Sequence, residues 1–588
     1  MFRNLNSLRT LLTRSKVAHH PARLALLAWF TRVIALLPLT LLLLPTSYTP
    51  RARSLAAAEP LVGPATSPPA GRSAASLAAV ADELLTRELA PADQPNHVKR
   101  CDDEVFIRRV SLDLIGYPAS PEQVTAFALD PDPLKRFHLV NRLMNDPRFG
   151  ENWGRYWRDV ILYRRTDERA LLGSEACQEF LTTQINQNKP WDEVATAFIT
   201  AQGDVREQGA TALIFAQSGE PEGVVAEISR IFNGIQIQCA QCHDHPTDRW
   251  KREQFHQLAA FLPRVALRPD MGGNRRTFHV AVTDTEPRFR PRMPNQRIFG
   301  TLEHYMPDLK DPSARGTLTT PIFFATGQSL PLGTADAERR ESLARWVTSS
   351  SNPWFAKALV NRLWGELVGE GFYEPLDDIG PDRQATAPQT LDHLAASFTA
   401  SGYDVKQLLR VIMATAAYQR DSRDRREPDA TPFAANVPQR LRADQLLNQL
   451  VVLLGLPDSP TGTAAAPPNA PAFRRTIRQQ FNQMFGFDPS EPREEVKSSI
   501  PQTLILMNSP GIQGAISARA GMLGSLLRQL PADEPVVVEL YLRALNRQPS
   551  PREIQIALSY IQETGNRGEA FEDLLWSLIN STEFLHRR

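Results

Sequence analysis

Two cysteines and a histidine lie close together in the sequence, where Cys239, Cys242 and His243 form the pattern C-x-x-C-H. A c-type haem is attached through this spacing: both thiols bond to the haem vinyl groups and the imidazole becomes the proximal iron ligand. On a helix the three side chains share one face, because residues three and four apart are neighbours there. The motif therefore predicts covalently bound haem c, with His243 as the metal ligand.

Two other kinds of site stay open for the same residues. The C-x-x-C pair followed by His256 begins a zinc-finger pattern, but residues 260–262, where a second histidine should follow, contain none. A zinc site built from the two cysteines, His243 or His245 and a distant ligand remains an alternative. A disulfide between the motif cysteines, with no cofactor, is the other, because an oxidising compartment favours it.

A six-coordinate haem iron needs a methionine or histidine on the side opposite the proximal ligand. The residues of the right type all lie downstream of the motif, and several fall in a loop-rich segment that could fold over the haem. They are Met271, Met293, Met306, His256, His279 and His304. We take Met271 as the predicted distal ligand.

The N-terminus has the pattern of an export signal. Residues 1–23 are basic, and residues 24–44 are apolar apart from Arg32. Residues 56–58 are three alanines and offer an A-x-A cleavage site. A signal peptide and an uncleaved membrane anchor are both consistent with this pattern.

Export agrees with the motif, because haem is attached to C-x-x-C-H outside the cytoplasm. We expect residues 1–58 to be a signal peptide or an N-terminal membrane anchor that tethers the protein to the membrane. Residues 59–76 are rich in Pro, Ala, Gly and Ser and read as a flexible linker. The predicted location is the periplasm or cell envelope.

Apolar residues recur at helical spacing through most of the remaining chain. We predict a mainly α fold with two helical modules, residues 77–285 and 333–586, joined by a loop-rich connector, residues 286–332, with a few short strands. The N-terminal module carries C-x-x-C-H. Helical patterns span residues 77–89, 102–115, 134–144, 153–163, 192–202, 222–236, 248–261, 334–349, 354–370, 389–401, 405–418, 438–454, 498–507, 511–530, 534–545, 551–564 and 567–580, and strand patterns span 277–282 and 317–325.

Short sequence patterns predict where some of these helices begin and which faces are buried. Ser120 and Pro121 are typical of the N-cap and first residue of a helix. The helix over residues 222–236 is expected to run directly into the motif. Trp153 and its neighbours Tyr156 and Trp157 share one helix face, which is more typical of a buried core than of a ligand site.

A group of polar residues stands out in the C-terminal module: Asn361, Arg362, Asp377 and Asp378. The first two lie within a predicted helix, and the two aspartates lie in the loop that follows. Paired carboxylates can bind calcium or serve acid–base catalysis. We instead predict a buried Arg–Asp pair that holds the loop to the helix.

Composition and motif content do not indicate a nucleic-acid-binding protein, a disulfide scaffold or an enzyme of a common class. The chain has 588 residues and a formal net charge of +1, so no basic excess indicates nucleic-acid binding. Its 4 cysteines are too few for a disulfide scaffold, although Cys101 and Cys177 could form one disulfide in an exported protein. The sequence lacks G-x-S-x-G, P-loop, H-E-x-x-H and dinucleotide-binding motifs, so it does not indicate an enzyme.

Longer runs of the sequence resemble a planctomycete cytochrome-associated family with two domains. The runs FIRRVSLDLIGYPASPEQV, RFGENWGRYWRDV and GIQIQCAQCHDHPTDRWKREQFHQLAAF resemble its N-terminal domain, domain of unknown function fifteen-forty-nine. The runs NPWFAKALVNRLWGELVGEGFYEPLDDIG, GYDVKQLLRVIMATAAYQRDS, PQTLILMNSP, LYLRALNRQPSPREI and LLWSLINSTEFL resemble its partner, domain fifteen-fifty-three. The family's CAQCHDHP run falls on residues 239–246, and Thr247 stands where the family often has Phe.

The resemblance implies an exported protein, often joined to a separate cytochrome c domain, that works beside other envelope redox or surface proteins. A single C-x-x-C-H occurs here, so that extra domain is not expected. The leading hypothesis is a monohaem protein for electron transfer in the envelope. The alternatives are a non-enzymatic scaffold with the motif as a disulfide or metal clip, and, last, a polysaccharide-related hydrolase.

Overall fold

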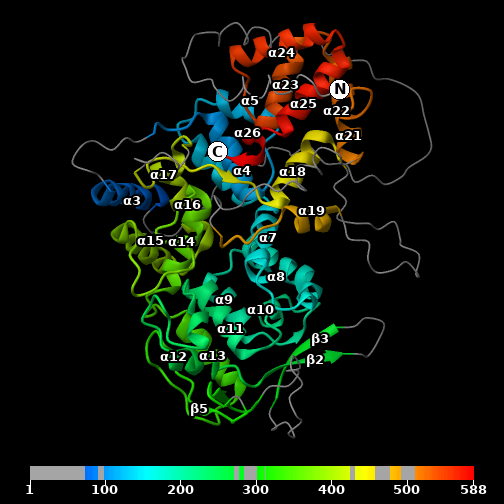
Figure 1. Ribbon diagram of the computed structural model, residues 1–588. Coiled ribbons are helices and arrows are strands. Elements are labelled where there is room, and N and C mark those ends of the chain that lie inside the picture. Colours follow the sequence, from blue (N-terminus) through cyan, green and yellow to red (C-terminus); the bar gives the residue numbers. More distant parts are fainter. Residues whose placement is uncertain are drawn as a thin grey trace, which may run out of the picture. The chain divides into compact units, whose positions relative to one another are not determined.

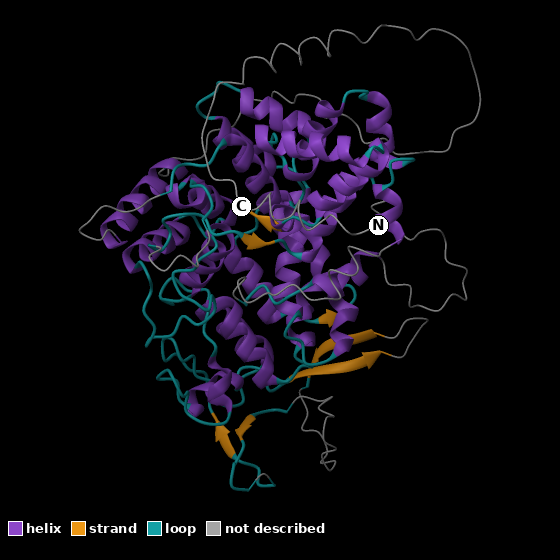
Figure 2. Cartoon of the chain, turned by 45° about the horizontal axis from the view of Figure 1, so that its top comes forward, coloured by secondary structure: helices purple, strands orange, loops and turns teal. Residues whose placement is uncertain are grey.

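Helices make up most of the chain, and the strands are few and short (Figure 2). The computed structural model describes residues 73–89, 98–270, 277–283, 301–311, 313–423, 431–456, 477–491 and 510–588. The predicted export signal, the linker to residue 72, Met271 and Met293 lie outside the described residues. All described residues belong to one compact unit, Arg72–Arg588. Among their helices none is both long and apolar enough to span a membrane.

The first half of the described chain is a series of helices that follow the predicted pattern closely. Helix α5 begins where expected: Ser120 caps it through a capping box with Gln123, and Pro121 is its first residue. The α-helices are α3 (Ala74–Leu89), α4 (Asp103–Ile115), α5 (Pro121–Leu129), α6 (Lys135–Met144), α7 (Arg148–Leu162), α8 (Ser174–Asn186), α9 (Trp191–Thr200), α10 (Ala212–Ala216), α11 (Pro221–Ile228) and α12 (Arg252–Ala259). Short turns of other helix types are η1 (Glu168–Gly173), η2 (Gly209–Thr211), η3 (Ser229–Asn233) and η4 (Ile237–Gln241).

The second half continues with helices, many of them at the predicted positions. They are α13 (Asp336–Val347), α14 (Phe355–Val368), α15 (Pro388–Ala400), α16 (Val405–Ala414), α17 (Ala416–Gln419), α18 (Ala443–Leu454), α19 (Ile477–Phe485), α21 (Pro510–Ile516), α22 (Gly521–Gln529), α23 (Asp533–Leu545), α24 (Pro551–Thr564), α25 (Arg567–Ile579) and α26 (Thr582–Leu585). The predicted helix over residues 405–418 is split, because Thr415 takes an extended backbone conformation and caps α17. The predicted helix over residues 498–507 lies outside the described residues.

In the part of the chain that the structure describes, strands form three small antiparallel sheets. Strands β1 (Gly203–Asp204), β3 (Thr277–Val282) and β2 (Val265–Asp270) pair in that order, and β3 has the predicted bounds. Strand β4 (His304–Met306) pairs with β5 (Thr317–Thr319), which is shorter than the predicted strand 317–325. Strand β6 (Gln439–Arg440) pairs with β7 (His586–Arg587), which brings the last residues beside the start of α18. The mainly α fold class is therefore confirmed.

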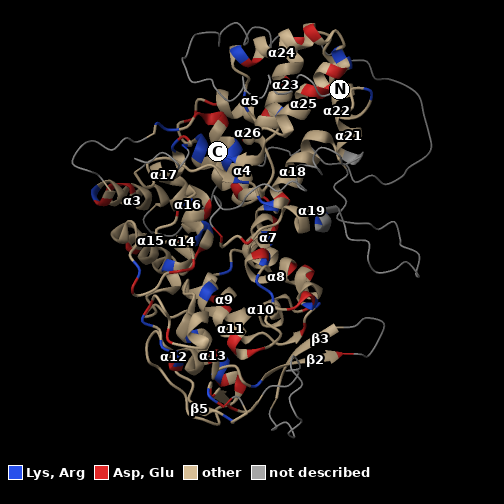
Figure 3. Ribbon diagram, viewed as in Figure 1, with Lys and Arg blue, Asp and Glu red and all other residues tan. Residues whose placement is uncertain are grey.

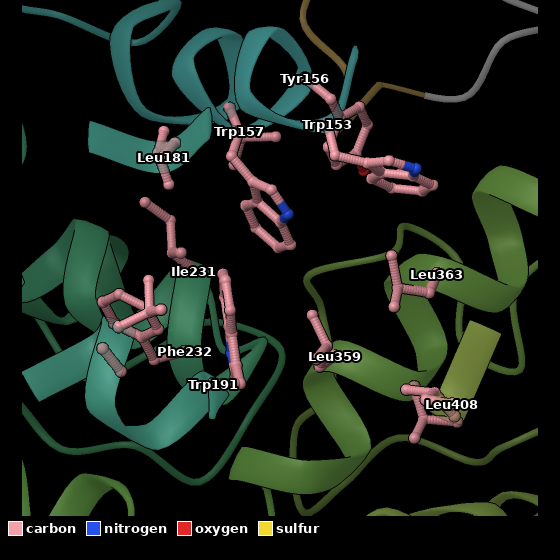
Figure 4. Packing of buried hydrophobic residues seen from close by; sticks show 14 of the residues in the cluster. Trp153, Tyr156, Trp157, Leu181, Trp191, Ile231, Phe232, Leu359, Leu363 and Leu408 are labelled. Atoms are coloured by element: carbon pink, nitrogen blue, oxygen red, sulfur yellow. The ribbon is translucent and has the colours of Figure 1, made fainter. Parts of the chain in front are cut away.

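The aromatic residues of α7 lie in the core, as predicted. Trp153, Tyr156 and Trp157 are at most 3% exposed, and Figure 4 shows them facing residues from other elements. Trp157 and Trp191 of α9 have ring centroids 4.4 Å apart. Burying such large side chains supplies much of the apolar area that stabilises a helical module.

In the described part of the chain, buried apolar side chains fall into two clusters, and the division between them lies elsewhere than the predicted connector. The first cluster contains most of the N-terminal helices together with α13 to α17, up to Phe433, and also Leu542. The second contains α18 and the helices that follow it, up to Phe584, and also Leu112 of α4. Helix α3, near the start of the described chain, packs against α15 and α16, and Figure 1 shows these elements side by side. The first half of the predicted C-terminal module thus shares a core with the N-terminal module.

Charged residues of both signs are spread over most elements rather than gathered by sign (Figure 3). Several are buried and paired, which is the condition under which charges are tolerated inside a protein. Arg230, Arg362 and Asp377 form one such group and lie beside the C-x-x-C-H motif.

Candidate functional site

The C-x-x-C-H motif lies in a loop, here called the motif loop (residues 234–251). Cys239 is on the 3₁₀-helix η4, and Cys242 and His243 follow in turns. All three residues are exposed, and both cysteines are free thiols. The expectation that a helix runs directly into the motif is wrong. Helix α11 continues as the π-helix η3, which ends at Gly234.

Gly234 explains why the helix stops. Its φ is 67°, in the left-handed region that ends helices and that glycine adopts without a steric penalty. A Cβ at this position would also lie 2.7 Å from Cδ1 of Ile379. The predicted helix over residues 248–261 is shorter in the structure. The motif loop extends to Lys251, and α12 begins only at Arg252.

The hydrogen bond of the His243 imidazole favours the tautomer in which Nε2 can bind a metal. Its Nδ1 lies 2.7 Å from the carbonyl oxygen of Asp244. A carbonyl only accepts, so Nδ1 is the donor, and in the neutral imidazole Nε2 is left with the lone pair. Metal-bound histidines commonly donate their second ring N–H in this way. Two thiols and one basic ring nitrogen on an exposed loop fit the chemistry of covalent haem attachment.

Helix α12 supports the motif loop from the side. The carbonyl of Gln241, between the two cysteines, accepts from Nε of Arg252 at 3.3 Å and from Nε2 of His256 at 3.1 Å. Nδ1 of the buried His256 accepts from Nε2 of His304, 2.9 Å away on β4. Burial lowers the pKa of His256, so the neutral form that these two bonds require is favoured.

These bonds bear on the predicted distal ligands. Both ring nitrogens of His256 are engaged, so His256 supports the loop in this structure and has no nitrogen available to a metal. His279 lies on β3, with Nε2 3.4 Å from a carboxylate oxygen of Asp270. Met306 lies on β4. Met271, the residue we selected, falls outside the described residues.

A buried ionic cluster holds the N-terminal flank of the motif loop. The carboxylate of Asp377 is fully buried and accepts from Arg230 at 3.0 Å and from Arg362 at 3.2 Å. Gln236 donates to the other oxygen of Asp377 at 3.0 Å. Burial alone would raise the pKa of Asp377, but Arg362 and Arg230 outweigh it and hold the pKa at about 2. The aspartate is therefore ionised at neutral pH.

The predicted Arg–Asp pair between Arg362 and Asp377 is confirmed. Asn361, beside Arg362 on α14, also binds the loop: its Nδ2 donates to the carbonyls of Tyr373 and Leu376 at 3.1 and 2.8 Å. The amide N–H of Tyr373 donates back to Oδ1 of Asn361 at 2.9 Å. The polar group thus fixes residues 373–383, here called the 373–383 loop, onto α14.

The C-terminal flank of the motif loop is held by exposed groups from the same 373–383 loop. Arg383 donates to the carbonyl and to Oγ1 of Thr247 at 3.1 and 3.0 Å. Arg249 donates to Asp382 at 2.6 Å, and both side chains are largely exposed. The hydrogen bond from Arg249 lowers the pKa of Asp382. These pairs are open to solvent and therefore weaker than the buried ones.

The remaining cysteines do not pair. Cys101 and Cys177 are both buried free thiols, so the disulfide considered from the sequence is not formed in this structure. Burial raises the pKa of Cys177 to about 12, which makes it an unreactive thiol at neutral pH. Within the ranges that the structure describes, no group of three or more His, Cys, Asp or Glu residues is placed to hold a metal ion.

Several residues that support the motif carry no local pattern that would predict this role. Arg230 and Gln236 precede the motif, but their partner Asp377 is 147 and 141 residues away in the chain. Gly380 and Arg383 follow the aspartates that the sequence did single out. Pairing across this separation leaves no local pattern, so only the folded chain reveals it.

The fold and the site define a mainly α-helical two-domain protein with an exposed C-x-x-C-H loop. Residues 81–266 match the family model PSCyt2, described as a protein of unknown function (DUF1549). Residues 339–561 match PSD1, also described as a protein of unknown function (DUF1553). The chain belongs to the family that combines these two domains, and the resemblance seen in the sequence is confirmed. No curated protein and no solved structure matches the chain.

Proposed function

We propose that this chain is an exported c-type haem protein of the periplasm or cell envelope that transfers electrons to or from other envelope proteins. Cys239 and Cys242 would carry the haem and His243 would bind its iron. The observation that carries the proposal is the arrangement of these residues: two exposed free thiols at the attachment spacing, and an exposed imidazole whose Nδ1, not its Nε2, is taken up by a backbone carbonyl. The family name PSCyt2 is consistent with an association with cytochromes.

The haem would supply a one-electron redox centre, and the chain's own residues would hold it at the surface. Exposure of the motif loop favours contact with a redox partner, because electron transfer needs a short distance between centres. Met271 is retained as the proposed distal ligand. The basic and apolar N-terminus supports export, either as a cleaved signal or as a membrane tether.

The deciding experiment is a haem assay on the full chain produced with a functional haem-attachment system. We expect a covalent haem band after denaturing electrophoresis and a pyridine haemochrome spectrum. Cys239→Ser with Cys242→Ser should abolish covalent haem, and His243→Ala should change the ligation spectrum. His245→Ala is the matched control, because it removes a histidine two residues away. Absence of covalent haem from the wild type would refute the proposal.

A second candidate is a non-enzymatic scaffold in which the motif cysteines act as a disulfide or metal clip. The exposure of both free thiols supports it, since a clip needs accessible sulfur. In that case the colourless protein would show a Cys239–Cys242 disulfide, or bound zinc, by mass spectrometry and metal analysis. Haem on the wild-type protein would rule this candidate out.

A further inference from the structure

The 373–383 loop reaches both flanks of the motif loop, although it belongs to the second family domain. On the N-terminal flank, the amide of Ile379 donates to the carbonyl of Gly234 at 2.6 Å. Asp377, two residues earlier, accepts from Gln236 at 3.0 Å. On the C-terminal flank, Arg383 holds Thr247 through two hydrogen bonds. Residues of one short loop thus contact the segments before and after C-x-x-C-H.

The two loops approach each other most closely at Gly380. A Cβ built on Gly380 would lie 1.6 Å from Oδ2 and 2.7 Å from Cγ of Asp248, so a larger residue fits only when the Asp248 side chain turns away or the motif loop moves. Turning the side chain away would break the hydrogen bond that its Oδ1 accepts from the amide of Arg249 at 2.7 Å. The close approach, and not the backbone angles, therefore favours glycine at position 380.

The motif loop has little regular structure of its own to fix its shape. It contains one 3₁₀ turn, η4, a type of helix with poorer hydrogen-bond geometry than an α-helix. Across its C-terminal half, the amide of His245 donates to the carbonyl of Trp250 at 2.8 Å. A loop of this kind takes its shape from contacts with other segments: helix α12 holds Gln241 in its middle, and the 373–383 loop holds its two ends.

We infer that the 373–383 loop of the second domain is a positioning element for the C-x-x-C-H motif, in addition to α12, with Gly380 and Arg383 as positioning residues. By fixing both flanks it sets the direction in which the two thiols and the imidazole face. A supported arrangement of this kind is what a covalently attached, metal-binding group requires. The inference assigns a role to the second domain and rests on the proposed function only for the identity of the group that is positioned.

The test adds a side chain at the close approach and measures hydrogen exchange in the haem-free protein. In the haem-free full chain, Gly380→Ala should raise the hydrogen-exchange rate of amides in residues 237–250 about 5-fold, as expected when hydrogen bonds of ordinary strength are lost. The His245 amide is the most informative, because it is bonded across the loop. Exchange in α24 and α25, which belong to the other core, should not change.

Three further variants separate positioning from general destabilisation. Adding Asp248→Ala to Gly380→Ala removes the atoms that the new methyl group meets, and should restore slow exchange. Gly514→Ala is the matched control, because a Cβ there has no atom within 4 Å and leaves the motif untouched. Arg383→Ala should accelerate exchange on the C-terminal flank alone.

The outcomes separate this inference from the proposed function. Unchanged motif exchange in Gly380→Ala, or failure of the double variant to restore it, overturns the positioning role. Faster exchange in Gly380→Ala together with a wild type that takes up no haem supports the positioning role and refutes the haem function. When the wild type does take up haem, Gly380→Ala should lower the yield several-fold and the double variant should recover it.

Discussion

The two flanks of the motif loop are held by the same 373–383 loop but by opposite kinds of interaction. The N-terminal flank depends on Asp377, which is 0% exposed and paired with two buried guanidinium groups. The C-terminal flank depends on Arg249 and Asp382, which are 62% and 43% exposed. Buried ion pairs are sensitive to loss of one partner, whereas exposed pairs are weak and screened by salt. The motif is therefore anchored firmly at one end and loosely at the other.

The largest expected difference between the flanks follows from Asp377→Asn. This change leaves Arg230 and Arg362 buried without their shared carboxylate, and should lower the free energy of unfolding by about 3 kcal/mol. Urea denaturation followed by circular dichroism measures it. Asp382→Asn is the control on the exposed flank and should leave stability close to wild type. Equal losses from the two variants would contradict the comparison.

The second-largest expected effect is a loss of folding stability in acid, caused by protonation of Asp377 on the N-terminal flank. The pKa of Asp377 is about 2 in the folded protein and 3.8 in the unfolded reference. A depressed pKa means that the ionised form stabilises the fold above the unfolded value, and that this contribution disappears as pH falls through the folded value. Stability amounting to about 2 kcal/mol should thus be lost between about pH 4 and pH 2.

Unfolding free energies measured from about pH 5 to pH 2 test this expectation. Asp377→Asn provides the comparison, because it should lack this component of the pH dependence while keeping that of the other carboxylates. If wild type and variant lose stability in parallel over this range, Asp377 is not the group that titrates.

Gly234→Ala should have a smaller effect that acts at the start of the motif loop. Its backbone has a φ of 67°, which costs a residue with a Cβ about 1–2 kcal/mol. The new methyl group also meets Ile379 at 2.7 Å. Gly402→Ala separates these costs, because its φ is 69° and no atom lies within 4 Å of the added Cβ. Thermal unfolding should show a greater loss for position 234 than for position 402.

Salt should give the smallest effect, and on the C-terminal flank alone. Raising ionic strength from about 0.01 M to about 1 M shortens the screening length from about 30 Å to about 3 Å. Exchange of amides near Arg249 should become about 2-fold faster, whereas amides near Gln236, beside the buried cluster, should not respond. In Asp382→Asn the salt response should disappear. A salt response of equal size on both flanks would show that burial does not distinguish them.

Patterns of short range predicted much of the fold correctly. The N-cap at Ser120, the start of α24 at Pro551 and the bounds of β3 follow from residues a few positions apart. Burial of Trp153 follows from helical periodicity in the same way. Such signals are reliable because the atoms that interact are also neighbours in the chain.

The helix expected to lead into the motif shows where local patterns fail. Apolar spacing continues to Gln236, but the chain turns at Gly234 because its left-handed backbone lets it pack against Ile379 and Ala358. Those partners lie more than a hundred residues away in the chain, so no sequence pattern around Gly234 predicts the contact. Contacts made in the folded chain overrode the helical pattern.

Local patterns in the sequence were enough to predict the mainly helical class, the aromatic core, the Arg362–Asp377 pair and the spacing of Cys239, Cys242 and His243. The folded chain was needed to show that the second domain supports the motif, that its first helices share a core with the N-terminal domain, and that His256 holds the loop through Gln241. The two groups of features differ in the sequence separation of the residues that interact. Helix propensity and motif spacing act over a few residues, whereas a buried carboxylate shared by two arginines depends on where distant segments meet.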